Sequence, residues 1–192
     1  AEIARQPVFV VAVLSAALGY GIMNLLMVAT PLAMDFCGFG FGFAAIVIQW
    51  HVIGMFAPGL VTGSLIQRFG VLGVIGAGVV IMLACIAVAL SGTTFTHFLV
   101  ALALLGIGWN FMYTGGTALL TEAYAPAEKA RVQGVNDFVV FATMGVSSAS
   151  SGALVSAAGW EIMNIASIPV LAVVAGAVGW LAWRRRTQPA LS

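Results

Sequence analysis

Six long apolar runs constrain this chain more than any other feature of its sequence. Most exceed the roughly 18–20 residues that cross about 30 Å of hydrocarbon. In lipid every backbone N–H and C=O must be paired within the protein, so such runs are predicted to be helices. The alternation of a membrane barrel strand is absent. We therefore predict an all-α membrane protein with six transmembrane helices. They are expected over residues 8–33, 44–66, 71–90, 98–123, 135–157 and 162–183.

The composition supports this class and argues against others. The chain of 192 residues is 62% hydrophobic and 7% charged, whereas soluble domains carry about 25% charged residues. Its net charge of +1 gives no basis for nucleic-acid binding. Cys37 and Cys85 have no nearby histidines that would complete a zinc site. The sequence predicts the lipid bilayer as a partner, and no metal, cofactor or nucleic acid.

The basic residues predict the orientation in the membrane. They lie at the termini or in the second and fourth loops, whereas the other loops contain neither Lys nor Arg. The seven are Arg5, Arg68, Lys129, Arg131, Arg184, Arg185 and Arg186. Because basic loops remain on the cytoplasmic side, both ends of the chain are predicted to be cytoplasmic.

Polar residues are spread unevenly over the six spans. The third and sixth are almost entirely apolar, whereas the first, second, fourth and fifth carry Asn, Gln, His, Thr or Ser. The order polar, polar, plain therefore occurs twice. Because three is an odd number, the second triplet must be inserted upside-down relative to the first, as in secondary transporters. We predict one bundle over residues 1–192, built as two inverted three-helix repeats.

Two loops carry a resemblance to a known family. The loop after the second span contains Gly63, Leu65, Arg68 and Gly70. It resembles the G-x-L-x-D-R-x-G-R signature of the major facilitator superfamily, with Gln67 in place of Asp. The segment 122–134 is similar to the P-x-E-x-R-x-x-x-x-G loop between the fourth and fifth spans of a half in that family. The altered signature favours its second copy, in a C-terminal half.

The resemblance implies a segment of a twelve-helix transporter, and not an enzyme. Such a protein moves a small molecule by alternating access, and its N-terminal six-helix half would be the missing partner of this segment. The first residues, Ala1-Glu2-Ile3, agree with a start inside a longer chain. Residues 49–58 and 109–110 also look like those of bacterial efflux permeases, one branch of which moves riboflavin. An inner-membrane location is implied; substrate, direction and coupling ion are left open.

The resemblance also implies a cytoplasmic gate. In relatives an acidic residue at the end of the fourth span takes part in a charge relay, so Arg68 and Glu122 are predicted to pair. The alternative is that both are solvated charges. Asp137 starts the fifth span, where the helix dipole favours a carboxylate; contact with the missing half is the second interpretation. The predicted gate comprises Gly63, Leu65, Arg68, Gly70, Glu122, Arg131 and Asp137.

A polar stripe on the fourth span is a candidate wall of a substrate cavity. Helical spacing places Asn110, Tyr113 and Thr114 near one face, close to Trp109. The alternative role is hydrogen bonding between helices. Tyr20 and Asn24 are four residues apart near the middle of the first span and are further candidates.

The second span adds two polar candidates that cannot both face one cavity. Gln49 and His51 are two residues apart and so about 200° apart around a helix. His51 either serves in proton coupling or is neutral and bonded to a neighbouring helix. Trp109, Tyr20, Tyr113 and Trp50 would suit an aromatic or amphipathic substrate, although packing alone would also account for them.

Other functional classes fit less well. A rhomboid-type protease needs its serine before a later histidine, but Ser151 follows both His51 and His97. An aquaporin-type pore needs Asn-Pro-Ala half-helices, which the sequence lacks. The remaining alternative is a stand-alone six-helix protein that dimerises into a transporter.

Overall fold

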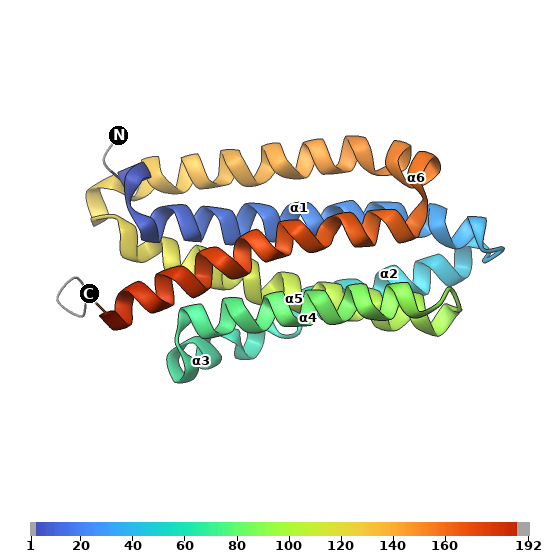
Figure 1. Cartoon of the computed structure of the whole chain (residues 1–192), viewed down its shortest axis with the longest axis horizontal. Coiled ribbons are helices and arrows are strands. Elements are labelled where there is room, and N and C mark those ends of the chain that lie inside the picture. The colour runs from blue at the N-terminus through green and yellow to red at the C-terminus, as the bar shows by residue number, and fades with distance from the viewer. Residues whose placement is uncertain (1–2, 188–192) are drawn as a thin grey trace.

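The computed structural model describes residues 3–187, and this part of the chain is helical, without strands. Figure 1 shows most of the helices as long rods that run roughly along one axis, whereas α3 is a short segment beside them. A 3-10 turn at Ile3–Arg5 precedes the first helix, and two more at Thr121–Ala123 and Pro126–Glu128 precede the last. The α-helices are α1 (Pro7–Phe36), α2 (Phe41–Phe56), α3 (Gly59–Phe69), α4 (Val71–Ser91), α5 (Phe95–Leu120) and α6 (Lys129–Thr187). The all-α prediction is confirmed for the described residues.

The helix α6 reverses its direction at Gly159. Its 59 residues are two helical arms that meet at a non-helical glycine with φ 82° and ψ 166°, and Figure 1 shows the second arm returning along the bundle. This conformation is open to glycine and costly for other residues. The predicted spans 135–157 and 162–183 fall on these arms, here called the first arm (129–158) and the second arm (160–187). Helix already begins at Lys129, earlier than predicted.

The predicted span 44–66 is broken in the structure. It consists of α2 and α3, which are bent by 41° at Ala57–Pro58. Proline has no N–H and its ring clashes with the preceding turn, so it interrupts a helix in its interior. A new helix, α3, starts directly after the break, because the N–H groups of Val61 and Thr62 donate to the Pro58 carbonyl at 2.9 Å.

The helix α5 lies in the middle of the bundle and packs against α1, α2 and α4. Glycines let the backbones approach closely on each side. A Cβ added at Gly106 would lie 2.5 Å from the His51 carbonyl of α2, and one at Gly108 would lie 3.0 Å from the Gly78 carbonyl of α4. One at Gly116 would lie 3.0 Å from the Ala12 carbonyl of α1. In lipid the hydrophobic effect does not drive helices together, so association depends on the close packing that small residues permit.

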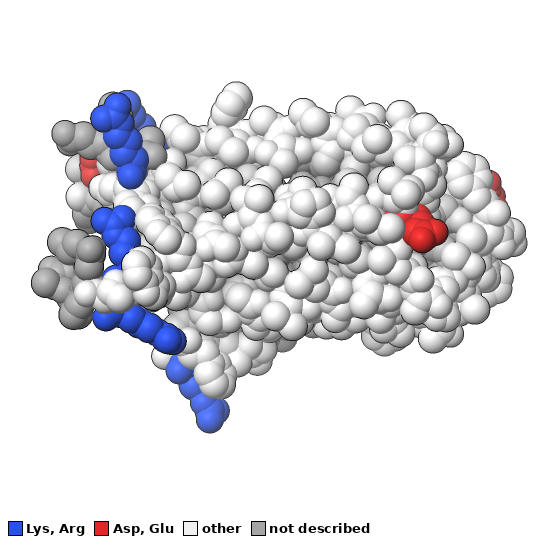
Figure 2. All heavy atoms as spheres, in the orientation of Figure 1, with Lys and Arg blue, Asp and Glu red and all other residues white. Residues whose placement is uncertain are grey.

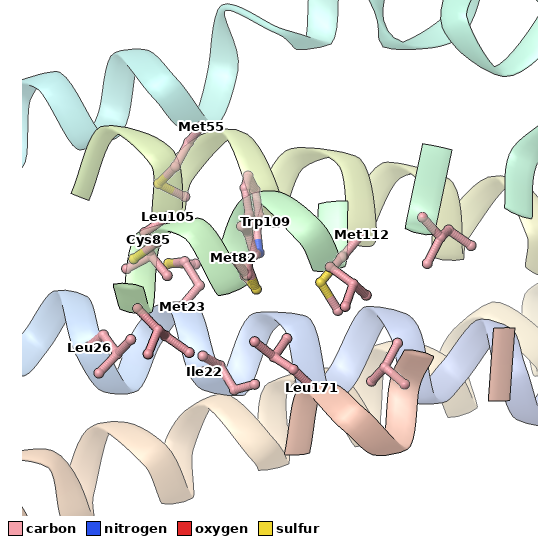
Figure 3. Packing of buried hydrophobic residues seen from close by; sticks show 14 of the residues in the cluster. Ile22, Met23, Leu26, Met55, Met82, Cys85, Leu105, Trp109, Met112 and Leu171 are labelled. Carbon is pink, nitrogen blue, oxygen red and sulfur yellow. The ribbon is translucent and has the colours of Figure 1, made fainter. Parts of the chain in front are cut away.

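Buried side chains from five helices form one continuous core around α5. In Figure 3, Met23 and Leu26 of α1, Met82 of α4 and Met112 of α5 belong to this core, together with Leu171 of the second arm of α6. Methionine is unbranched and fills irregular gaps between helices. The core therefore ties the second arm to the α1 and α5 pair.

Length and hydropathy qualify four helices of the described chain as candidate membrane spans, and the bent α2–α3 pair would add a fifth. In that count α6 is a single helix. Figure 2 shows Lys and Arg gathered at one end of the molecule, here called the basic end, with an uncharged belt beside it. The start of α1 and the end of α6 lie at this end in Figure 1. The charge distribution is that of a protein embedded in lipid.

We expect Gly106→Ala to destabilise the α2–α5 contact. The new methyl group would meet backbone atoms of His51 and Met55, which cannot rotate away. Overpacking of this kind costs about 1–3 kcal/mol. The matched control is Gly176→Ala, where the added Cβ meets nothing within 4 Å and helix propensity favours alanine. Thermal unfolding of the purified full-length protein in detergent measures both. Equal stability of the two variants would contradict the close-packing interpretation.

Candidate functional site

An aromatic cluster lies near the middle of α1, α5 and the bent α2–α3 pair. Trp109 and Tyr113 are stacked, with ring centroids 5.1 Å apart and an 8° interplanar angle. Tyr20 of α1 contacts both edge-to-face, at 5.3 and 5.4 Å. Phe56, at the end of α2, contacts Trp109 at 6.3 Å. Sequence analysis did not select Phe56, whose position depends on the break that follows it.

The members of this cluster differ in accessibility. Trp109 is buried, Tyr20 and Tyr113 are half-buried, and Phe56 is 64% exposed. Aromatic pairs in these geometries contribute about 0.5–1.5 kcal/mol beyond the area they bury. Trp109 is therefore the inner member of the cluster, and the exposed ring surface belongs to the two tyrosines and Phe56.

Asn110 connects α5 to the break between α2 and α3. Its Nδ2 donates to the Met55 carbonyl at 2.7 Å, and its Oδ1 lies 2.7 Å from the Thr62 hydroxyl. Thr62 also reaches the Pro58 carbonyl at 2.8 Å. Asn110 is buried. The structure thus uses Asn110 for hydrogen bonds between helices, the alternative to the cavity-lining role.

Asn24 has a corresponding role between α1 and the first arm of α6. Its Nδ2 donates to the Met144 carbonyl at 3.2 Å and to the Ser147 hydroxyl at 3.0 Å. One turn further on, the Ser151 hydroxyl donates to the Leu25 carbonyl at 3.1 Å. These bonds hold α1 against the first arm. Thr114 is half-buried on α5, and its carbonyl accepts a bond from Thr117.

His51 and Gln49 point in different directions, as their spacing predicts. His51 is fully buried, and its Nδ1 lies 2.8 Å from the Leu102 carbonyl of α5. Its Nε2 has no hydrogen-bond partner among the described residues. Gln49 is exposed, as is its neighbour Trp50. This arrangement matches the interpretation of His51 as a histidine bonded to a neighbouring helix.

Glu122 pairs with a different arginine from the one predicted. Its Oε2 accepts a bond of 2.6 Å from Arg185, at the end of α6. The guanidinium of Arg68 instead lies over the neighbouring Phe69 ring, 5.3 Å from its centroid. Sequence analysis missed this partner because it treated Arg184–Arg186 as one cluster, and only the fold shows that Arg185 is the member that reaches Glu122.

The other predicted gate residues lie at the basic end without forming one site. Gly70 separates α3 from α4 with φ 79° and ψ 153°, a conformation that favours glycine. Gly63 and Arg131 are exposed and Leu65 is half-buried. Asp137 is exposed and accepts a bond of 3.3 Å from Asn136. Within residues 3–187 no group of His, Cys, Asp and Glu is arranged to hold a metal ion.

A cavity of about 480 Å³ lies between α1 and both arms of α6. Leu18, Ile22 and Leu25 line it from α1. At 100° per residue these positions lie on the side of α1 opposite to Tyr20. The cavity is therefore separate from the aromatic cluster, and α1 lies between them.

We expect Asn110→Ala to lower stability while affinity per folded molecule is unchanged. The variant leaves the Met55 carbonyl without its side-chain donor, at a cost of about 1–2 kcal/mol. Thr117→Val is the control, because that hydroxyl bonds only within α5, to Thr114 at 3.0 Å. Thermal unfolding in detergent measures the difference. If the Asn110→Ala protein had normal stability but bound the ligand more weakly, the result would favour the cavity-lining role of Asn110.

A double-mutant cycle tests the Glu122–Arg185 pair. The side chains are 44% and 34% exposed, so their coupling in unfolding free energy should be about 0.2–1 kcal/mol and should fall with salt. Glu122→Gln and Arg185→Gln should be non-additive. Glu122→Gln combined with Arg68→Gln should be additive. Coupling of Glu122 to Arg68 instead would restore the pairing expected from the sequence.

Comparison with known proteins gives consistent matches. The family model described as Major Facilitator Superfamily matches residues 4–192. Riboflavin transporter RfnT of Brucella anthropi is 42% identical over 173 residues, which cover 90% of this chain and 44% of that protein. The uncharacterized MFS-type transporters YdeG and YddS of Bacillus subtilis are 32% and 30% identical, and the matches cover 75% and 87% of this chain.

The matched regions span less than half of each of these relatives, namely 44%, 34% and 38% of their lengths. No solved structure matches the chain significantly. The family match extends over nearly all of the sequence, including both loop motifs and the residues of the aromatic cluster. The helical membrane bundle and the matches agree, and the chain belongs to the major facilitator superfamily.

Proposed function

We propose that this chain is the C-terminal half of a secondary transporter that moves a small aromatic molecule by alternating access. Family membership supports transport in general. The observation that carries the proposal is the aromatic cluster, which joins the middle of α1 and of α5 to the end of α2 and leaves two tyrosines and Phe56 partly accessible. Substrate sites of secondary transporters lie near the bilayer midplane at the interface of repeats.

Six membrane crossings follow if the bent α2–α3 pair counts as one and the two arms of α6 as two. We propose this topology, with two inverted triplets and with the basic end on the cytoplasmic side of a bacterial inner membrane. The gathering of Lys and Arg at one end supports the orientation. The broken second crossing supports a transport role, since interrupted helices occur where a path crosses the membrane.

The partner is proposed to be an N-terminal six-helix half. The matched relatives are more than twice as long as the matched region, which leaves room for it. The first arm of α6 exposes Phe138, Phe141, Gly145 and Gly152, and a Cβ at either glycine would meet nothing within 4 Å. Small and aromatic residues on an exposed face suit contact with another helix bundle. A second copy of a six-helix protein is the alternative partner.

The substrate is proposed to be a flavin-like heteroaromatic compound. The name of the Brucella anthropi relative specifies riboflavin, and a flat fused ring can stack on Tyr20, Tyr113 and Phe56. Stacking of a heteroaromatic ring on one aromatic side chain contributes about 1–3 kcal/mol. The sequence leaves the direction open, and we propose efflux from the resemblance of residues 49–58 and 109–110 to bacterial efflux permeases.

The proposed gate lies at the basic end. Alternating access requires contacts there that form and break as the two halves rock. The exposed Glu122–Arg185 pair costs little to open, and Arg68 in the last turn of α3 is the proposed contact with the other half. The Gly63–Gly70 segment is the proposed hinge region of this gate.

The test is riboflavin flux through the full-length protein in proteoliposomes, measured in both directions. Tyr20→Ala and Tyr113→Ala should each weaken riboflavin binding about tenfold, because each removes one stacking ring worth roughly 1.4 kcal/mol. The corresponding Tyr→Phe variants should keep most of the affinity. Trp183→Ala, an exposed aromatic residue outside the cluster, is the matched control.

Three results would each count against one part of this proposal. Riboflavin flux equal to that of empty liposomes would contradict riboflavin as the substrate, without contradicting transport of another compound. Parental affinity in both Tyr→Ala variants would move the site away from the cluster. Influx alone, without release from loaded vesicles, would reverse the proposed direction.

A further inference from the structure

We propose that the cavity between α1 and the two arms of α6 holds an acyl chain of an anionic phospholipid, whose headgroup lies on the basic end near Arg184. This site is separate from the proposed substrate site and does not depend on it. The cavity measures about 480 Å³. Ala142 and Val146 of the first arm and Ala166 of the second are exposed members of its lining. The cavity is therefore open to the surroundings of the bundle.

The lining offers a ligand mainly hydrocarbon. The hydroxyls of Thr143, Ser147 and Ser167 belong to the lining, but each donates to a carbonyl one turn earlier in its own arm, at 2.8, 2.9 and 3.0 Å. Their hydrogen-bonding capacity is largely used, so the cavity favours an apolar occupant. In a bilayer the abundant apolar occupant is a lipid chain.

One face of the second arm leads from the cavity to the basic end. Ala166 and Val170 line the cavity, and steps of three and four residues continue to Val173, Ala177, Trp180 and Arg184. Val173 and Trp180 are 55% and 47% exposed. The Arg184 guanidinium lies over the Trp180 ring, 5.6 Å from its centroid. The stripe therefore ends in an aromatic residue and a cation, as at a membrane–water interface.

The length of this stripe matches one lipid leaflet. From Val170 to Arg184 the helix rises about 21 Å, at 1.5 Å per residue. Half of a bilayer, from midplane to the outer edge of the headgroups, measures about 20–22 Å. A lipid with its phosphate at Arg184 would therefore place the end of its chain beside Val170, in the cavity.

The charge at this end selects an anionic headgroup. All three segments that line the cavity carry basic residues at the same end: Arg5 precedes α1, Lys129 and Arg131 open the first arm, and Arg184–Arg186 close the second. Arg185 is engaged by Glu122. Glu128 and Asp137 are the other described acidic residues near this end, so basic residues remain in excess. Basic clusters beside a transmembrane helix attract anionic lipids.

Native mass spectrometry of the delipidated full-length protein in detergent tests the proposal. Dioleoyl phosphatidylglycerol should bind more tightly than dioleoyl phosphatidylcholine, which lacks the net charge. It should also bind more tightly than dihexanoyl phosphatidylglycerol, whose chains are too short to reach the cavity. Arg184→Gln should weaken dioleoyl phosphatidylglycerol binding about fivefold, and Ala166→Phe, which fills the cavity, should weaken it several-fold.

Two variants serve as matched controls. Arg68→Gln removes a basic residue at the same end but outside the cavity segments, and Ala172→Phe adds an aromatic ring on an exposed position of the second arm that does not line the cavity. Both should bind the lipid like the parent, and thermal unfolding checks the folding of all four variants. Equal binding of the choline lipid or of the short-chain lipid would overturn the proposal. Parental binding by a folded Ala166→Phe protein would also overturn it.

Discussion

Backbone polar groups inside a hydrocarbon layer must find partners within the protein, and the bundle depends on how it meets this requirement at its irregular points. Pro58 lies at the bend between α2 and α3 and has no N–H to donate to the preceding turn. Asn110 supplies a side-chain donor to the Met55 carbonyl and an acceptor to Thr62. On the buried side of the break, at Met55 and Thr62, α5 therefore supplies the side-chain hydrogen-bond partners. Asn24 and Ser151 bond to backbone carbonyls between α1 and the first arm of α6 in the same way.

Close approach of backbones makes these bonds possible. An amide side chain is short, so Asn110 reaches α2 only because Gly106, one turn away on the same helix, lets the two backbones come together. His51 benefits from the same contact when its ring meets the Leu102 carbonyl. Packing and hydrogen bonding are thus coupled along the α2–α5 contact, and a change in either is expected to affect both. This coupling explains why polar residues at mid-membrane need not indicate a water-filled path.

Much of the architecture could be predicted from the sequence because it depends on local physical properties. Long apolar runs predict helices, and the positions of Lys and Arg predict a single charged end. The break at Pro58 was missed because a proline inside an apolar run also occurs in continuous, kinked membrane helices. The extension of helix from residue 135 back to Lys129 was missed because that segment is polar. The predicted spans correctly left Gly159 in the turn between two helices. How tight that turn is depends on the positive φ of Gly159, which composition does not reveal.

The site was harder to predict than the fold because it depends on partners from distant segments. Helical spacing correctly placed Gln49 and His51 on different faces. It could not distinguish an amide that lines a cavity from one that bonds to another helix, since both lie on a polar stripe. Choosing Arg185 over Arg68 as the partner of Glu122 likewise requires the positions of two helix ends far apart in sequence.

The position of α1 has a consequence for the membrane dependence of this protein. One side of α1 carries Tyr20 and the aromatic cluster, and the opposite side forms a wall of the apolar cavity. A single helix, about 10 Å thick with its side chains, therefore separates the proposed sites. If a ligand at either site shifts α1, thermodynamic linkage requires the two affinities to change by the same factor. The lipid composition around the bundle would then act as an effector of binding at the aromatic cluster.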